Sequence, residues 1–351
     1  MHKAKSILLC LGCLLLLHGC YYMQAARGHL GLMQKREPIT HLLQDPGVTA
    51  ELKDMLTAVQ AARRFSVERM ALPDNDSYTD YVQTGKPYVV WNVFATREFS
   101  LEPELSCFPV AGCVGYRGYF AEEAAIRRRD ALAARGLDVT IGGVSAYSTL
   151  GRFADPVLDT MARHGRRQLV ETVFHELAHQ RIYVKGDTRF NESFATAVAT
   201  LGMEEWLHGR GDAAQLAEYR EQRQRDNDLQ QLISDKRLQL KALYDSDADT
   251  LTMRAKKRAI FVELAAELRE FYRGPALPDW FAGELNNATL LPFNLYGRWQ
   301  PAFASLFVEC ERDFACLYAR ADQLAALPAD ERHEALERML DKVSTNAFAT
   351  G

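Results

Sequence analysis

The sequence predicts an α+β protein that is mainly helical and contains a small sheet. Long stretches carry apolar residues at three- and four-residue steps, which is the period of an α-helix, and a shorter region is rich in β-branched and aromatic residues interrupted by Gly and Pro. The chain has 351 residues, which is enough to bury one large core. We therefore expect a single domain over residues 20–351.

Residues 1–19 have the composition of an export signal and are not expected to join the fold. Lys3 and Lys5 give a positive start, and an apolar run of eleven residues follows, too short for the roughly 20 residues that span a bilayer. The run leads to Cys20 in a stretch that resembles a bacterial lipobox, so we expect Cys20 to carry a lipid as the first residue of the mature protein. A signal cleaved without lipidation, or an uncleaved anchor, is the alternative.

The expected location is the cell envelope. Position 22 holds Tyr22 and not Asp, which by resemblance to lipoprotein sorting rules favours the periplasmic side of the outer membrane; a soluble periplasmic protein is the alternative. Loss of the signal removes Lys3 and Lys5, so the formal charge changes from −4 to −6. This balance indicates a soluble body without a membrane-binding face, and the lack of a basic block argues against nucleic acid as a partner.

Four cysteines are expected in the mature chain besides Cys20, and an oxidising compartment would pair them. They are Cys107, Cys113, Cys310 and Cys316. Four cysteines allow three pairings. Because five residues separate the members of each near pair, we favour two local loops, Cys107 with Cys113 and Cys310 with Cys316. A metal role is the alternative, but the spacing is wider than in a zinc knuckle.

The first part of the mature chain is predicted to be helical and the next part to contain strands. Apolar residues recur at helical steps over residues 21–70. Residues 88–95 are predicted to form a strand, and residues 108–116 a turn region that leads into another strand. A charged helix at 121–135 and a short strand at 138–147 follow. As an edge strand, this last segment could lie along a bound peptide by β-addition.

Residues 166–184 are predicted to form an amphipathic helix in which His175 and His179 lie four residues apart. Two imidazoles at this spacing project together from a rigid element, so they can supply two ligands about 2 Å from one zinc ion. Glu176 follows the first histidine, where its carboxylate can reach a water at the metal without being a ligand. The pattern predicts one Zn²⁺ per chain; two histidines satisfied on a helix face are the alternative.

A second helix is expected to begin shortly after the histidine helix. Gly186 can end the first helix in a left-handed cap, and Asp187 or Thr188 can cap the next one. A buried apolar stripe then continues along the second helix.

The third metal ligand is expected from this second helix. Glu192, thirteen residues after His179, could turn back towards the metal. Two histidines and one glutamate leave open the fourth position that a hydrolase requires. The alternatives are that Glu192 is a surface acid, or that Glu204 or Glu205 is the ligand instead.

Residues 210–273 are predicted to form a long antiparallel helical hairpin that projects from the domain as an arm. The stretch is strongly charged, and its apolar residues recur at helical steps on both sides of a polar turn. A solvated packing arm is the simple interpretation, and an arm that docks another envelope protein is the alternative.

Two pairs of segments resemble known families. Residues 175–180 followed by residues 191–195 resemble the gluzincin pattern, HExxH and then NExxA. Residues 20–28 and 286–296 resemble the bacterial putative aminopeptidase family of envelope proteins, and the resemblance covers most of the mature chain. It implies a zincin-like core, with a small sheet and two active-site helices, and a zinc peptidase that acts on peptide or protein substrates.

The sequence departs from the gluzincin pattern at two places. The interval between His179 and Glu192 is shorter than is usual in gluzincins. In the best-known gluzincin aminopeptidases, an upstream Gly-x-Met-Glu-Asn segment binds the substrate's free amine, whereas the comparable residues 142–147 contain no acid. Peptide hydrolysis is therefore better supported than aminopeptidase specificity.

Catalysis would need a base and a group that stabilises the oxyanion. Glu176 is expected to take the proton of the attacking water and return it to the leaving amine. Tyr296 is the candidate for stabilising the oxyanion, with Tyr147 and His208 behind it.

A non-catalytic envelope lipoprotein is the competing hypothesis. In that case a structural zinc ion would hold two helices together, and the arm would bind another protein. Glu176 favours the enzyme, because a structural site has no need of an acid at that position.

Overall fold

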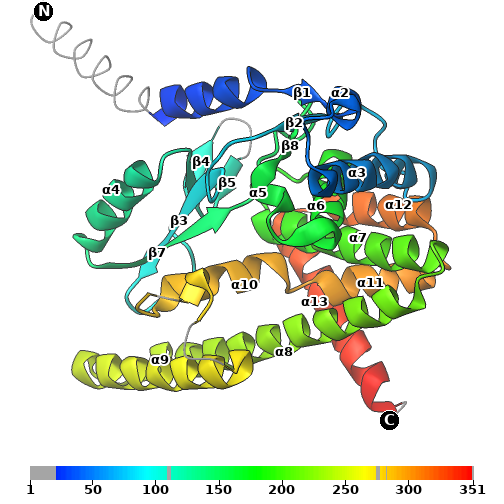
Figure 1. The fold of residues 1–351 in the computed structure, drawn as a ribbon. Helices are drawn as coiled ribbons and strands as arrows, with labels where there is room; N and C mark the ends of the chain where they lie inside the picture. The colour runs from blue at the N-terminus through cyan, green and yellow to red at the C-terminus, as the bar shows by residue number, and fades with distance from the viewer. Residues whose placement is uncertain (1–20, 109–111, 274–276, 282, 350–351) are drawn as a thin grey trace, which may run out of the picture.

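Helices make up most of the molecule, and the strands form small sheets of two or three strands, which confirms the α+β, mainly helical prediction. The computed structural model describes residues 21–108, 112–273, 277–281 and 283–349, without the side chains of 294–296 and 343–349. Figure 1 shows the sheets on one side of a helical body and the arm across the bottom. Within the described residues, no helix is both long enough and apolar enough to cross a membrane.

The segment predicted to be helical, residues 21–70, contains three helices. They span residues 21–33, α2 (Ile39–Gln44) and α3 (Ala50–Glu68). α3 begins at Thr49, whose hydroxyl accepts a hydrogen bond from the N–H of Leu52 at 3.3 Å. Its apolar face is buried against the histidine helix, so the predicted periodicity marks true core positions.

The main sheet is centred on β3 (Val90–Arg97), which pairs antiparallel with β6 (Arg117–Tyr119) on one side and β7 (Leu137–Val144) on the other. β3 and β7 are the strands predicted at 88–95 and 138–147. Helix α4 (Glu122–Ala133) covers one face and buries apolar side chains against β3 and β7. β7 is an edge strand of this sheet among the described strands.

A second sheet connects the N-terminal part of the chain to the segment before the histidine helix. β1 (Glu37–Pro38) pairs antiparallel with β2 (Asp80–Val82), which pairs parallel with β8 (Val157–Leu158). The short helix α5 (Asp159–Ala162) follows β8 and leads into the histidine helix. This sheet therefore fixes where that helix starts.

Both disulfides are local, as the five-residue spacing predicts. Cys107 and Cys113 lie opposite each other in the hairpin of β4 (Ser106–Phe108) and β5 (Gly112–Val114) and are bonded.

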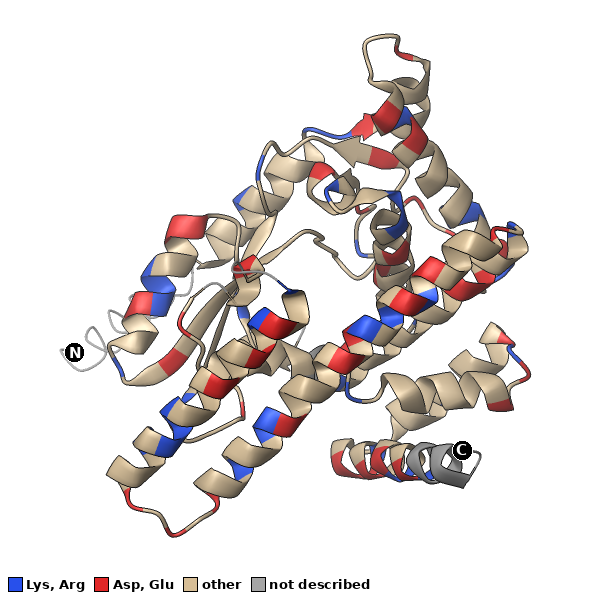
Figure 2. Ribbon diagram, turned by 60° about the horizontal axis from the view of Figure 1, so that its bottom comes forward, with Lys and Arg blue, Asp and Glu red and all other residues tan. Residues whose placement is uncertain are grey.

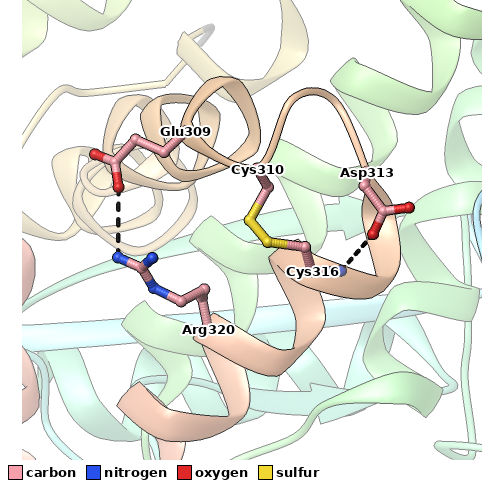
Figure 3. Close-up of a disulfide and its surroundings, with 5 residues drawn as sticks. All are labelled: Glu309, Cys310, Asp313, Cys316 and Arg320. Carbon is pink, nitrogen blue, oxygen red and sulfur yellow. Dashed lines mark hydrogen bonds and ion pairs between the residues drawn. A yellow bond between two sulfur atoms is a disulfide. The ribbon is translucent and has the colours of Figure 1, made fainter.

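The second bridge joins Cys310 to Cys316 at the corner between α11 (Gln300–Glu309) and α12 (Phe314–Ala326). Figure 3 shows this corner, where the Asp313 carboxylate accepts a hydrogen bond from the N–H of Cys316 at 2.6 Å. The bridge and the cap together fix the turn between the two helices.

The core is built around α6 (Gly165–Arg181) and α7 (Thr188–Gly209), which pack against each other and against α3 and α11. The largest buried side chains here are aromatic: Trp299, Tyr78, Tyr219, Tyr318, Phe174, Phe190, Phe194, Phe303 and Phe307. Dense aromatic packing on both helices holds their facing sides at a fixed separation.

The arm consists of α8 (Ala213–Tyr244) and α9 (Thr250–Tyr272), as the charged helical pattern predicts. Figure 2 shows acidic and basic residues along both helices. The arm does not project freely from the domain, which corrects that part of the prediction. Lys257 of α9 pairs with Asp138 of β7 at 2.6 Å, and both side chains are largely buried.

Three short helices lie between the arm and the sheet. They are the 3₁₀-helices η1 (Asp279–Phe281) and η2 (Asn287–Leu290) and the α-helix α10 (Leu291–Tyr296). Asn286 donates a hydrogen bond to the backbone oxygen of Val139 at 3.2 Å, so this region covers the beginning of β7.

A buried ion pair fastens the C-terminal helix α13 (Ala329–Ala349) to the start of α7. Asp187 accepts hydrogen bonds from Arg332 at 2.7 Å and from His333 at 2.8 Å, and its other oxygen accepts from the N–H of Phe190. The side chains of Asp187 and Arg332 are only 6% and 5% exposed. Burial alone would raise the pKa of Asp187, but these three partners lower it below its usual value.

We expect Asp187→Asn to lower the free energy of unfolding at pH 7 by about 3–5 kcal/mol, because it leaves the Arg332 charge buried without its partner. Since the pKa is lower in the folded state, this stabilisation is present above the unfolded pKa of about 3.9 and is lost as the pH falls through the folded pKa. Denaturant unfolding at pH 7 and pH 3 should show that the difference in the free energy of unfolding between the wild type and Asp187→Asn is smaller at pH 3. The control is Glu334→Gln, which breaks an exposed pair with Arg338 and should change stability by at most about 0.5 kcal/mol.

Candidate metal centre

His175 and His179 come from the last two turns of α6 and face the same point. Their Nε2 atoms lie 3.1 Å apart. The helix buries its apolar residues, including Phe174 and Leu177, on the side of the core, and this rotation turns the two imidazoles towards α7. The spacing of four residues therefore brings the pair together as the sequence predicts.

Glu192 completes a triangle with the two histidines. Its Oε2 atom lies 3.3 Å from Nε2 of His175 and 3.4 Å from Nε2 of His179. Ligand atoms bound tetrahedrally at about 2.0–2.1 Å from one ion are about 3.3–3.4 Å apart, so the triangle has the size that one such ion needs. These three residues are also the group of His, Cys, Asp and Glu side chains that could hold a metal ion among the described residues.

Glu204 and Glu205 do not belong to this triangle. They lie twelve and thirteen residues further along α7, roughly 18–20 Å away along the helix axis. Their carboxylates face Arg312, which pairs with Glu205 at 2.5 Å. The alternative that either of them is the third ligand is therefore wrong.

Asn191 fixes the loop between α6 and α7. Its side-chain oxygen accepts from the N–H of Val184 at 2.7 Å, and its side-chain N–H donates to the Val184 oxygen at 2.8 Å. Asp187 caps α7, as predicted, by accepting from the N–H of Phe190 at 3.0 Å. The two hydrogen bonds of Asn191 keep the loop tight, which explains how the short interval between His179 and Glu192 still brings the two side chains together.

Gly186 has a different role from the predicted one. Helix α6 ends at Arg181 with Ile182 extended, so Gly186 is not its cap. Gly186 lies in the loop with a positive φ of 84°, and the β4–β5 hairpin lies directly against it. A Cβ added at Gly112 of that hairpin would lie 2.6 Å from the backbone nitrogen of Gly186, so Gly112 is needed for close approach, whereas Gly186 is favoured by its positive φ.

The electrostatics of the triangle favour a negative Glu192 between positive or metal-bound partners. Burial alone would raise the pKa of Glu192, but the charge of His179 and hydrogen bonds with both imidazoles lower it to about 2. Burial lowers the pKa of His179, and the neighbouring Glu192 raises it by more. A cation is therefore favoured at the point where the three side chains meet.

The side chain of His175 is 19% exposed, against 7% for His179 and 11% for Glu192, so the triangle is reached from solvent on the side of His175. Nδ1 of His179 is buried and has no hydrogen-bond partner among the described residues, so packing and the Nε2 contacts hold this ring.

Glu176 lies beside the triangle on α6 without being part of it. It is half-buried. Burial raises the pKa of its carboxyl above the usual value, although His175 and His179 act in the opposite direction. A carboxyl with a raised pKa next to a metal triangle is suited to taking up and returning a proton near neutral pH.

The chain matches one protein family over most of its length. The family described as "Putative aminopeptidase" matches residues 20–336. The chain belongs to this putative aminopeptidase family. No curated protein and no solved structure matches it.

The family's description points to a peptidase, so the remaining polar groups around the triangle are of interest as substrate-facing groups. Three tyrosines that the sequence did not point to lie within electrostatic reach of the triangle or of Glu176. Burial and then Glu192 raise the pKa of both Tyr116 and Tyr183, and Glu176 also acts on Tyr116. Tyr183 lies four residues after His179, a spacing that could have pointed to it, and their rings are 6.3 Å apart.

Tyr78 approaches Glu176 from the loop before β2. Burial, Glu176 and Asp155 raise the pKa of Tyr78 well above its usual value, although a contact with Ser148 acts in the opposite direction. Gln180, the residue after the second histidine, holds this loop: it accepts from Asn75 at 2.7 Å and donates to Ser77 at 3.2 Å. No local signal in the sequence links this loop to α6.

The three residues predicted to stabilise the oxyanion lie in different surroundings in this member of the aminopeptidase family. His208 is exposed and lies sixteen residues after Glu192, roughly 24 Å along α7, so that prediction is wrong. Tyr147 packs against the rings of Phe120 and His29. Tyr296 ends α10, but its side chain lies outside the described residues, so its role stays a prediction.

Packing explains the two glycines at the end of β7. A Cβ added at Gly142 would lie 1.8 Å from the ring of Trp280, and one added at Gly143 would lie 2.2 Å from the ring of Tyr88. These positions of β7 are therefore covered by aromatic rings. Residues 142–147 contain no acidic side chain, so this segment offers no carboxylate to bind the free amine of an aminopeptidase substrate.

Proposed function

We propose that the chain is a zinc-dependent peptidase of the cell envelope. His175, His179 and Glu192 would hold one zinc ion, and Glu176 would be the general base. The observation that carries the proposal is the triangle of Nε2, Nε2 and Oε2 atoms with sides of 3.1–3.4 Å, with a carboxyl that is not part of it on the same helix.

The donor set favours zinc. Two imidazoles and one carboxylate are a ligand set of catalytic zinc sites, whereas calcium and magnesium are bound mainly by oxygen atoms. When bound, zinc would polarise a substrate carbonyl and make water a good nucleophile at neutral pH.

The protein's own residues would supply the proton transfers. Glu176 would accept a proton from the attacking water and then donate it to the nitrogen of the leaving amine, which breaks the peptide bond. Its raised pKa brings the carboxyl closer to the working pH, which helps both transfers. Glu192, with a pKa of about 2, would stay ionised throughout.

Two observations support an envelope lipoprotein. The family match begins at Cys20, the residue that the lipobox interpretation makes the first of the mature chain. The two local disulfides suit an oxidising compartment. We therefore propose lipidation at Cys20 and a location on the periplasmic side of the outer membrane.

The test uses the purified full chain with its metal content measured by elemental mass spectrometry. It is incubated with a peptide library and with matched peptides that carry a free or an acetylated N-terminus. We expect about one zinc per chain, cleavage that a chelator stops and added zinc restores, and, for an aminopeptidase, cleavage only at free N-termini. Cleavage that is unaffected by complete zinc removal would contradict the proposal. Zinc retained with no cleavage of any peptide would favour the non-catalytic alternative, in which the arm binds another protein.

We propose Tyr116 as the group that stabilises the oxyanion, because its ring packs 5.5 Å from that of Phe94 and its hydroxyl lies near enough to Glu192 and Glu176 for both charges to raise its pKa. Replacing it with Phe removes only the hydroxyl, and loss of one such donor typically lowers kcat about 10²–10³-fold. We expect this loss in steady-state kinetics on a cleaved peptide, with little change in KM.

The matched control is Tyr147→Phe, because Tyr147 packs against two rings instead of facing the metal triangle. This variant should keep its kcat. Equal effects of the two substitutions would show that Tyr116 has no special role.

A further inference from the structure

The helix at residues 21–33 is fixed firmly to the main sheet, directly after the expected lipid attachment at Cys20. The hydroxyl of Tyr21 donates to the backbone oxygen of Gly118 at 3.1 Å, and the N–H of Phe120 donates to the side-chain oxygen of Gln24 at 3.2 Å. The Arg117 guanidinium also lies 4.0 Å from the centre of the Tyr21 ring. The orientation of this helix is therefore tied to that of the whole body.

The outer side of the helix is apolar and exposed. Tyr22, Met23 and Leu30 are 44%, 50% and 56% exposed, and the small residue Ala26 lies exposed between them. These three are a third of the nine large hydrophobic residues that are exposed in the described part of the chain. A fourth, Phe153, places its ring 4.7 Å from His29 of the same helix. Such clustering distinguishes a docking surface from scattered exposed residues.

A cationic cavity lies beside this apolar stripe. It has a volume of about 210 Å³, and Arg27, Lys35 and Lys86 line it together with Gly28 and Gly31 of the helix. No acidic residue lines it, and none of the three cations forms an ion pair within the described residues. Lys86 donates to the backbone oxygen of Phe120 at 3.3 Å, which holds its ammonium group at this position.

The local charge differs from that of the whole chain. The net negative charge of the mature chain indicates a body without a membrane-binding face, yet residues 21–36 contain three basic residues and no acidic one. The acidic residues lie elsewhere, many of them on the arm across the molecule (Figures 1 and 2). The net charge of the whole mature chain therefore does not describe the region next to Cys20, which is basic and apolar.

We propose that this face is a membrane-contact site: the stripe of Tyr22, Met23 and Leu30 enters the surface of a phospholipid bilayer, and the cavity lined by Arg27, Lys35 and Lys86 takes the phosphate of a lipid headgroup. Exposed apolar residues flanked by cations are the pattern of a helix that lies in a membrane interface. The attachment at Cys20 selects the occupant, because a lipid chain on the adjacent residue brings this face to the bilayer. This inference rests on the proposed envelope location.

Such a contact would fix the orientation of the protein relative to the bilayer. Lipid on Cys20 would attach only the start of the chain to the bilayer, and a second contact of basic and apolar residues would add affinity and fix the orientation of the body. The helix lies at the top edge of the molecule in Figure 1, and the arm lies across the bottom. The contact would therefore hold the arm on the far side from the bilayer.

The test measures whether Leu30 enters the lipid. The full chain, as isolated, is bound to vesicles of phosphatidylethanolamine and phosphatidylglycerol with or without brominated acyl chains. Leu30→Trp adds a fluorophore to the stripe, and the control Leu251→Trp adds one at an exposed position, 75% accessible, at the start of α9 in the arm. We expect brominated lipid to reduce the added Leu30→Trp fluorescence at least twofold and to leave the added Leu251→Trp fluorescence unchanged.

The cationic cavity is tested in the same Leu30→Trp background. Replacing Arg27, Lys35 and Lys86 together with Gln should remove at least half of the quenching. The matched control replaces three exposed basic residues of the arm, Arg225, Lys256 and Arg258, and should keep the quenching in full.

The outcomes separate this inference from the proposed anchoring. Mass spectrometry of the N-terminus reports acylation independently. Quenching of Leu30→Trp in a chain that carries no lipid would therefore support the contact site and contradict the proposed lipidation of Cys20. Equal quenching at both positions, or none at either, would overturn the contact site. An unquenched Leu30→Trp in a chain that is dimeric by light scattering would also overturn it and assign the face to a second copy.

Discussion

Replacing Glu176 with Gln is expected to abolish peptide cleavage while the protein keeps its metal ion. Gln has the size of Glu but cannot take the proton of the attacking water, and loss of general acid–base catalysis lowers rates by about 10²–10⁴-fold. Metal binding should persist, because the triangle consists of His175, His179 and Glu192 alone. The measurements are kcat/KM on a cleaved peptide and zinc content of the same preparation.

A second acid substitution controls for general effects on the helices. Glu204→Gln changes a half-buried glutamate of α7 that lies far from the triangle, and it should retain both zinc and activity. If Glu176→Gln instead cleaved peptides at the wild-type rate, Glu176 would not be the base. If it lost zinc, its carboxylate would be a ligand and the roles assigned to the triangle would change.

Removing one corner of the triangle should remove the metal. His179→Ala leaves only His175 and Glu192, and the cavity left behind supplies no replacement donor. Loss of a mere hydrogen-bond partner of a ligand lowers metal affinity by about 10–100-fold, so loss of the ligand itself should lower it by more. We expect the zinc content after dialysis to fall from about one per chain to near zero, with loss of activity.

His208→Ala is the matched control for this substitution. His208 is exposed in the last turn of α7 and should leave zinc content unchanged. The metal should also stabilise the fold, since a ligand bound only to the native state raises the free energy of unfolding. Added zinc should therefore raise the melting temperature of the wild type and not that of His179→Ala. Full zinc retention by His179→Ala would disprove the ligand set.

Local sequence signals predicted most of the fold and the metal triangle for a physical reason. His175 and His179 lie on one helix, so their spacing alone decides that they meet. Glu192 could be placed because Asp187 marks the start of the next helix and so sets the position of each residue along it. The helices and strands likewise follow from periodicity that is complete within each segment.

What the sequence did not reveal depends on contacts between distant segments. Tyr78 and Tyr116 reach the site from loops about 90 and 50 residues before the start of α6, and no periodicity connects them to it. Gly186 was misassigned because a positive φ is equally suited to a helix cap and to a loop pressed against another strand. The docking of the arm rests on contacts with distant segments, which composition does not show: the pair of Lys257 with Asp138, and an apolar cluster that joins both helices to Phe281 and Leu290.

The two disulfides close very small rings, and this decides what they can do for the molecule. A bridge stabilises mainly by removing freedom from the unfolded chain, by about 2 kcal/mol for a ring of seven residues against nearly 5 for one of a hundred. Neither bridge therefore holds distant parts of the chain together. The one between Cys107 and Cys113 instead shapes the hairpin that lies on Gly186, in the loop that joins the two helices of the triangle. Its reduction would loosen the surroundings of the triangle while the aromatic core stayed folded.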